Sequence, residues 1–186
     1  MDSSSYLCRT ISKSLIMKQY ALLHGVCGLA EGYSDTTVRW FKTMDDAQHH
    51  KGELLASLMT LPHELVESST DGTQDIITYI DRECEQEILK IIPYEPMFDS
   101  QSRREYLIWN QMDCETPFDG EYLPSDMGVV KDLCERMEDV DETFSVDALH
   151  EFIRDLWYGG AAMFDSDDLC IYYFRIPKSK EFNNDN

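Results

Sequence analysis

The chain has 186 residues, with 36 acidic side chains against 16 basic ones, and its net charge is −20. Nucleic acid and anionic membrane would be repelled by this charge, so we exclude both as direct partners. Hydrophobic residues make up 42% of the chain, including 3 Trp, 10 Tyr and 8 Phe, which excludes a wholly disordered acidic chain. No apolar run approaches the roughly 18–20 residues that a membrane-spanning helix needs.

The charge imbalance lies in one block. Residues 1–60 hold six basic and six acidic side chains, whereas residues 61–170 hold 7 basic and 28 acidic ones, a net charge of −21. A compact protein tolerates such self-repulsion for solubility or for attraction to a basic partner. The block therefore indicates either a well-solvated acidic surface or a binding surface for a basic protein.

The two ends of the chain are polar and unpatterned. We expect residues 1–16 to form a flexible arm, residues 17–178 a single domain and residues 179–186 a polar tail. The apolar segment 18–28 and the β-branched and aromatic segment 36–42 predict two strands joined by a Gly-rich connection. Together they predict an antiparallel hairpin.

Helical spacing of apolar residues predicts the next elements. Thr43 followed by two aspartates is typical of a helix start, and this helix would end before Pro62. A second helix is predicted over 74–91, ended by Pro93, and a short third one follows Ser102. The apolar stripe of the second helix consists of Ile76, Ile80, Cys84, Ile88 and Ile91.

The remaining elements follow an acidic segment. Residues 113–126 contain two prolines, a glycine and no basic residue, and predict an exposed loop. Residues 127–140 predict a helix, Ser145 predicts the cap of another that stops at Gly159-Gly160, and 169–176 predicts a strand. The fold expected is α+β. A small, about three-stranded, mainly antiparallel sheet of the N-terminal hairpin and the C-terminal strand would be packed by four or five helices.

The six cysteines favour a reducing compartment. No signal sequence precedes them, and neither CxxC nor CxxH spacing occurs, so neither a disulfide framework nor a zinc site of usual spacing is predicted. We expect reduced thiols and a cytoplasmic protein, in the host cytoplasm if the chain is viral.

Two clusters could carry metal or acid–base chemistry. His49, His50 and Glu53 share one face of the first helix, and Asp165, Asp167 and Asp168 precede the last strand. A small metal-assisted hydrolase is the alternative function that they suggest. Solvated helix faces and turns account for the same residues, and motifs for a phosphate-binding loop or an activated nucleophile are missing. We therefore expect no catalytic residue, no metal and no cofactor.

The acidic segment after residue 112 is the most specific feature. In composition and size the chain resembles phage-type nucleic-acid mimics, without a shared motif. The function expected is an acidic inhibitor or decoy that occupies the basic surface of a nucleic-acid-handling protein; a merely soluble acidic domain is the remaining alternative. The residues predicted to bind the partner are Asp113, Glu115, Asp119, Glu121, Asp126, Asp132, Glu135, Glu138, Asp139, Asp141 and Glu142.

Overall fold

The structure is a computed structural model that describes eight stretches of the chain. These are residues 18–28, 33–80, 86–94, 104–110, 121–123, 125–139, 145–166 and 169–177. Within them, nine strands form two antiparallel sheets, and three α-helices and one π-helical turn flank the sheets.

The first sheet, sheet A, has five strands in the order β2-β1-β5-β4-β3. Strand β5 lies at its centre and pairs antiparallel with both β1 and β4. The strands are β1 (Gln19–Gly28), β2 (Tyr33–Phe41), β3 (His63–Ser68), β4 (Gln74–Tyr79) and β5 (Gln86–Tyr94).

The second sheet, sheet B, has four strands in the order β7-β6-β9-β8. Strand β9 pairs antiparallel with both β6 and β8, although it follows both of them in the chain. The strands are β6 (Tyr106–Asn110), the three-residue β7 (Glu121–Leu123), β8 (Ala161–Ser166) and β9 (Leu169–Arg175).

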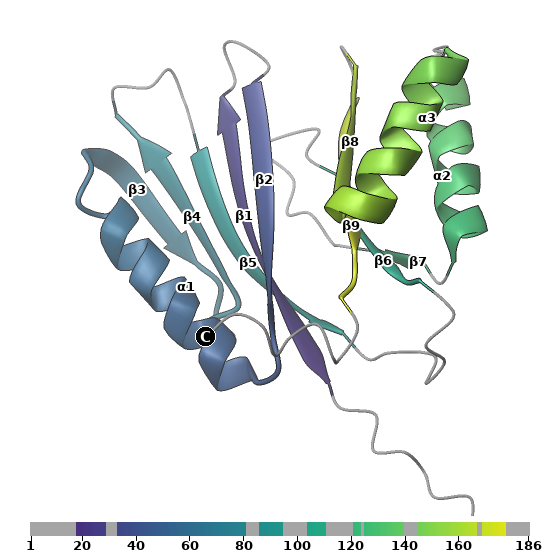
Figure 1. Cartoon of the computed structure of the whole chain (residues 1–186). Coiled ribbons are helices and arrows are strands. Elements are labelled where there is room, and N and C mark those ends of the chain that lie inside the picture. Colours follow the sequence, from purple (N-terminus) through teal and green to yellow (C-terminus); the bar gives the residue numbers. More distant parts are fainter. Residues whose placement is uncertain are drawn as a thin grey trace, which may run out of the picture.

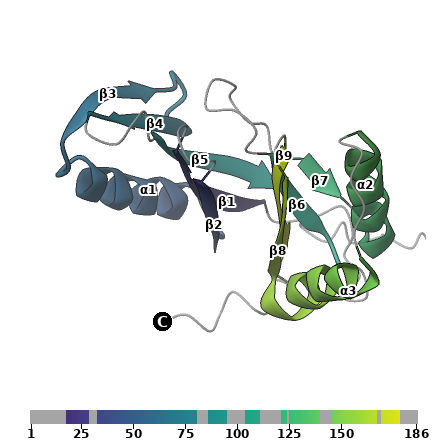
Figure 2. The same ribbon diagram turned by 90° about the horizontal axis from the view of Figure 1, so that it is seen from above.

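The elements form four layers, as Figures 1 and 2 show. Helix α1 (Met44–Leu58) covers the outer face of sheet A. Helices α2 (Asp126–Asp139) and α3 (Val146–Arg154) cover the outer face of sheet B. Helix α3 continues into a π-helical turn, η1 (Asp155–Gly159), which ends where Gly160 adopts a left-handed backbone with φ 86°.

The main core lies between the two sheets. Successive side chains of a strand point to opposite faces, so in the central strands one set meets the other sheet while the other set meets a helix. The inner set is Ala21, Leu23, Ile88 and Ile92 of sheet A with Leu107, Trp109, Cys170, Tyr172 and Phe174 of sheet B.

Both outer faces carry a smaller core. On sheet A, Ala47 of α1 packs against Leu22 and Ile91. On sheet B, Leu133 of α2 and Phe152 of α3 pack with strand residues of the opposite parity, including Tyr106, Ile108, Ile171 and Tyr173. Strands β5, β6 and β9 are therefore buried on both faces.

The predicted fold class is wrong. The sequence predicts one three-stranded sheet, made of the N-terminal hairpin and the C-terminal strand, with four or five helices. The described residues instead form five- and four-stranded sheets with three α-helices, and the C-terminal strand β9 lies in sheet B, apart from the hairpin β1–β2 in sheet A. The largest error is the helix predicted over 74–91, which is the strand pair β4 and β5. Its apolar stripe is accidental: burial in β4 alternates strictly, and Ile80 is 58% exposed.

Four further strands were missed. The short helix predicted after Ser102 is strand β6, and β7 lies inside the predicted acidic loop. The segments of β3 and β8 received no strand prediction. In β6, four consecutive residues from Tyr106 to Trp109 are buried, so the sequence has no period that tells a strand from a short buried helix.

The other elements agree with the sequence. Strands β1, β2 and β9 and helices α1, α2 and α3 occupy the segments predicted for them within a few residues. Thr43 Oγ1 accepts the N–H of Asp46 at 3.1 Å, and Ser145 Oγ accepts that of Ala148 at 3.1 Å, so both predicted caps are confirmed. The predicted arm and the whole predicted tail lie outside the described residues.

Candidate functional site

The first helix of the outer layer on sheet B is held by an aspartate at its start. Asp126 accepts hydrogen bonds from Arg104 Nη1 at 2.9 Å and from the hydroxyl of Tyr106. Tyr106 lies on β6 and is fully buried, and the guanidinium of Arg104 lies 5.0 Å from the ring centre of Trp157 in η1. This one carboxylate thus links α2 to the sheet and, through Arg104, to the end of α3.

A second aspartate, six residues further along α2, repeats the arrangement. Asp132 Oδ2 accepts hydrogen bonds from the hydroxyl of Tyr173 at 2.8 Å and from Arg136 Nε at 2.9 Å. Tyr173 comes from β9, the neighbour of β6, and packs edge-on against Phe152 of α3. Each of the two carboxylates therefore has one tyrosine from the sheet and one arginine as donors.

Both tyrosines are held in their neutral form. Burial is the main cause that raises the pKa of Tyr106, and the hydrogen bond to Asp126 raises it further. Burial likewise raises the pKa of Tyr173, followed by the negative charge of Asp132. Both phenols therefore remain hydrogen-bond donors over the whole physiological pH range, which suits them to fixing the helix.

The solvent side of this layer is acidic. Helices α2 and α3 and turn η1 hold eight acidic residues against three basic ones, a net charge of −5. Asp126 and Asp132 are hydrogen-bonded within the layer, and among the side chains that the structure describes there, the exposed carboxylates are those of Glu135, Glu138, Asp147, Glu151 and Asp155. The exposed cations of the layer already pair with acidic residues of the same layer: Lys131 lies 3.1 Å from Glu135, and Arg154 lies 3.2 Å from Asp155. We call this surface, defined by those five carboxylates, the acidic helical face.

The structure brings together some of the eleven acidic residues predicted to bind a partner. Asp126, Asp132, Glu135, Glu138 and Asp139 lie on α2, and Glu121 lies on the neighbouring strand β7. The other five, Asp113, Glu115, Asp119, Asp141 and Glu142, lie outside the described residues. On α3 and η1, the predicted set omitted Asp147, Glu151 and Asp155, which the fold places in the same layer.

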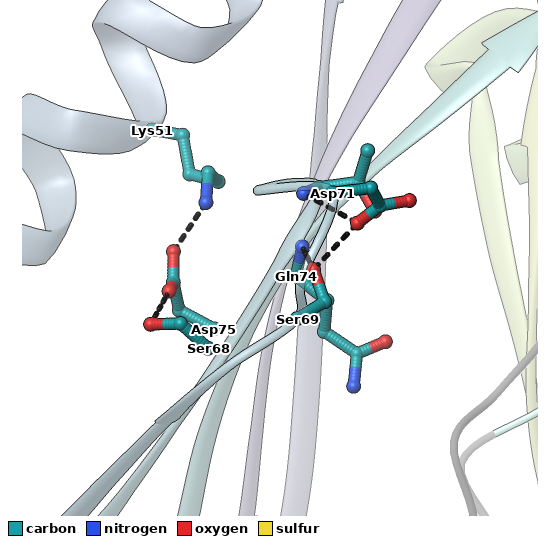
Figure 3. A network of polar contacts seen from close by, with 7 residues as sticks. Lys51, Ser68, Ser69, Asp71, Gln74 and Asp75 are labelled. Atoms are coloured by element: carbon teal, nitrogen blue, oxygen red, sulfur yellow. Dashed lines mark hydrogen bonds and ion pairs between the residues drawn. The ribbon is translucent and has the colours of Figure 1, made fainter.

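The outer layer on sheet A is held differently, by a buried ion pair. Lys51 of α1 is 7% exposed, and its ammonium donates to Asp75 Oδ2 on β4, which is 3% exposed (Figure 3). Ser68 Oγ on β3 donates to the other carboxylate oxygen at 2.5 Å. The pair is thus enclosed between a helix and two strands, and its carboxylate is bonded through both oxygens.

The turn between β3 and β4 adds a second, exposed carboxylate network, also drawn in Figure 3. Asp71 Oδ1 accepts from Ser69 Oγ at 2.7 Å, from Thr73 Oγ1 at 2.7 Å and from the N–H of Thr73 at 3.0 Å. These hydrogen bonds, that from Ser69 first, lower the pKa of Asp71 from 3.8 to about 2. Gly72, with φ 70°, completes the turn.

A third polar cluster crosses sheet A beside the ion pair. Glu87 of β5 is 6% exposed; its Oε2 lies 2.5 Å from His24 Nε2 on β1, and its Oε1 accepts from the hydroxyl of Tyr79 on β4 at 2.9 Å. An imidazole next to a carboxylate is the geometry of a general base. Within the described part of the chain, no hydroxyl or thiol bonds the His24 ring, so the cluster lacks a nucleophile there.

The two histidines suggested for a metal centre both lie beside Glu53 on α1. His49 Nε2 and His50 Nδ1 lie 3.5 and 3.4 Å from Glu53, and the guanidinium of Arg39 lies 2.7 Å from His50 Nε2. Asp165 is exposed on β8, and Asp167 and Asp168 lie outside the described residues. Among the described residues, no three His, Cys, Asp or Glu side chains form a group that could hold a metal ion.

Sequence reasoning missed both buried polar clusters of sheet A. The partners of the Lys51–Asp75 pair are 24 residues apart and those of the His24–Glu87 pair 63 residues apart. A local signal existed only for Asp75, which is a polar residue within a β-branched segment and occupies one of the alternate positions that β4 buries. The prediction of a helix over this segment obscures that alternation.

Comparison of the chain with known proteins leaves the site to be interpreted from its own geometry. In the described segments, no helix is long and apolar enough to cross a membrane. No protein-family model, no curated protein and no solved structure matches the chain.

Proposed function

We propose that the protein binds a basic, nucleic-acid-handling protein and competes there with DNA or RNA. The acidic helical face, together with the acidic segment 113–142, is the binding surface in this proposal. The observation that carries it is that the basic side chains of this layer are already bound within the protein. Arg104 and Arg136 bond carboxylates at the sheet, and Lys131 and Arg154 pair with exposed acids. The exposed excess of negative charge is thereby left to solvent or to a partner.

Electrostatic arguments support a protein partner. An excess of negative charge on one layer steers a basic partner into contact and repels anionic ones, so that it raises the association rate more than the affinity. The rigid attachment of α2 through Asp126 and Asp132 supports the proposal too, since fixed charges lose less entropy when a partner binds. The polyanionic face would occupy a groove that otherwise holds phosphates.

The experiment compares two triple variants. In the first, Glu135, Glu138 and Glu151 of the acidic helical face are replaced by Gln. The matched control replaces Glu53, Glu64 and Glu67, which are exposed on or beside the other outer layer, so that both variants lose three charges. Each protein is added to a panel of purified basic nucleic-acid-binding proteins loaded with a short fluorescent DNA duplex, and displacement is followed by stopped-flow anisotropy.

We expect the parent and the control variant to displace the duplex from at least one panel member at low salt. The first variant should do so several-fold more slowly, and the difference should shrink above 0.1 M salt, where the Debye length falls below about 10 Å. Equal rates for the two triple variants would contradict a specific acidic face. No displacement by the parent from any panel member would favour a merely solvated acidic surface.

A further inference from the structure

Strand β8 forms an edge of sheet B. It pairs with β9 on one side, and within the described residues no strand pairs with its other side (Figure 1). We propose that this edge binds an extended, basic segment of a partner protein, which adds to sheet B as a further strand. The choice of a basic segment rests on the proposed function, whereas the use of the β8 edge follows from its geometry.

The hydrogen bonds of β9 define which groups of β8 point outward. The N–H of Arg175 donates to the carbonyl of Gly160 at 2.8 Å, in the register that pairs Ala161 with Phe174. In an antiparallel ladder, bonded and non-bonded pairs alternate, so Ala162 and Phe164 also point their backbone groups toward β9. Ala161, Met163 and Asp165 consequently point theirs to the open edge.

The other side of β9 supports this assignment. The N–H of Ile176 donates to the carbonyl of Glu105 at 2.8 Å, in the register that pairs Leu107 with Phe174. Phe174 and Tyr172 therefore bond β6, and they cannot also bond Ala161 and Met163, which lie opposite them on β8. Three N–H and three C=O groups of β8 are thus directed away from the sheet.

The same three residues expose their side chains. Met163 is 45% exposed and Ala161 and Asp165 are also exposed, whereas Phe164, on the opposite face, is 3% exposed. An incoming strand would meet two small or apolar side chains and one carboxylate. Alternation of apolar and basic side chains is the pattern that complements them.

Of the other edge strands, which are β2, β3 and β7, strand β3 of sheet A is blunted. Its register is broken by an irregularity between His63 and Leu65, and Glu64 and Glu67 are exposed along it. Bulges and charges are the devices by which sheets discourage edge pairing. Strand β8 has a continuous register over six residue pairs and one charged residue, Asp165.

A second copy of the chain is a poor occupant of this edge. Each copy carries a net charge of −20, and Asp155 at the start of η1 and Asp165 in β8 are both exposed. Like charges across a newly formed strand pair destabilise the pairing, whereas a lysine or arginine opposite Asp165 stabilises it. The charge of the edge therefore selects a basic segment over self-association.

The experiment uses the full chain and a short peptide of alternating valine and lysine as the probe. The control peptide has the same charge but carries proline in place of valine, so that it cannot form a ladder. Binding is measured by fluorescence anisotropy at low and moderate salt. We expect the parent to bind the valine peptide at least about tenfold more tightly than the proline peptide, because several backbone hydrogen bonds are gained.

The test variant is Met163→Pro, which removes an outward N–H without removing a bond to β9. It should weaken binding of the valine peptide about tenfold or more, whereas Met163→Thr, which keeps the N–H, should bind within about twofold of the parent. Met163→Lys leaves the backbone unchanged and places a cation at the edge, so it should also weaken binding and covers the case in which the proline variant fails to fold.

Three outcomes would overturn the inference: equal binding of the two peptides, parental affinity in Met163→Pro, or parental affinity in Met163→Lys. The two experiments together distinguish a failure of this inference from a failure of the proposed function. If the parent displaces DNA from a basic protein but shows no preference for the valine peptide, the acidic helical face stands and the strand-addition site does not. If the preference is found without displacement, the reverse holds.

Discussion

The two outer layers of the molecule are attached to their sheets by opposite electrostatic arrangements. On sheet A, the helix contributes the cation and the sheet the anion, in the Lys51–Asp75 pair, and both groups are almost fully buried. On sheet B, helix α2 contributes the anions, and the neutral hydroxyls of Tyr106 and Tyr173 in the sheet donate hydrogen bonds to them. Arg104 and Arg136 then complete the neutralisation in positions that water still reaches.

This difference indicates different sensitivities to substitution. A buried charge left without its partner costs far more than a polar group left without one of several donors. The attachment of α1 to sheet A should therefore fail when either member of the buried ion pair is changed, whereas six side chains share the attachment of α2 to sheet B. The layer that carries the acidic helical face is consequently the one that tolerates variation better.

The largest effect is expected from Lys51→Met. The substitution leaves the Asp75 carboxylate buried without its cation, and we expect the free energy of unfolding to fall by about 3–5 kcal/mol in urea denaturation. As a control, Lys131→Met breaks an exposed pair with Glu135 and should cost at most about 0.5 kcal/mol.

A second variant sharpens this prediction. Lys51→Met combined with Asp75→Asn removes the buried charge and keeps an acceptor for Ser68 Oγ, so most of the lost stability should return. A loss below about 1 kcal/mol in the single variant, or no recovery in the double variant, would mean that the pair does not carry the attachment of α1.

An intermediate effect is expected from Tyr173→Phe. The variant keeps the ring against Phe152 and removes only the donor to Asp132, which retains Arg136. We expect a loss of about 1–2 kcal/mol by thermal or urea denaturation. Tyr158→Phe is the matched control, because its side chain is 83% exposed, and it should be neutral. A neutral Tyr173→Phe would place the attachment of α2 in apolar packing alone.

The smallest effect is expected in the β3–β4 turn and depends on pH. The pKa of Asp71 is lowered from 3.8 to about 2, so the folded state keeps this carboxylate ionised where the unfolded chain already binds a proton. Its contribution is fully present above about pH 4 and is lost as the pH falls through 2. Asp71→Asn should thus reduce stability slightly at neutral pH, with less effect at pH 2. A constant difference between pH 6 and pH 2, measured by urea denaturation, would speak against this role.

Local features of the sequence were sufficient for about half of the elements. The caps at Thr43 and Ser145 are formed by atoms three residues apart, and the apolar stripe that runs from Phe152 of α3 to Leu156 of η1 belongs to one continuous segment. Such signals depend on neighbours in the chain only, and the helices that begin after these two caps are present.

The sheets depend on distant segments and were largely missed. Ile88 faces the other sheet and Ile91 faces α1, so β5 is apolar on both sides and has no strand period. An isoleucine every three or four residues then imitates a helix. The same limit applies to the site: the sequence placed Asp126 and Asp132 on an acidic segment, but their bonding to tyrosines 20 and 41 residues away could not be read from it.

The position of β9 has a consequence for synthesis on the ribosome. All strands of sheet A, and the helix that covers it, lie between Gln19 and Tyr94, so this half can close while the rest of the chain is still being made. Sheet B cannot, because β9 lies between β6 and β8 and follows both. Until β9 emerges, the side of β6 that it will occupy stays unpaired, beside the apolar side chains from Tyr106 to Trp109. The nascent chain thus passes through an interval in which a finished sheet is joined to an open, aggregation-prone one.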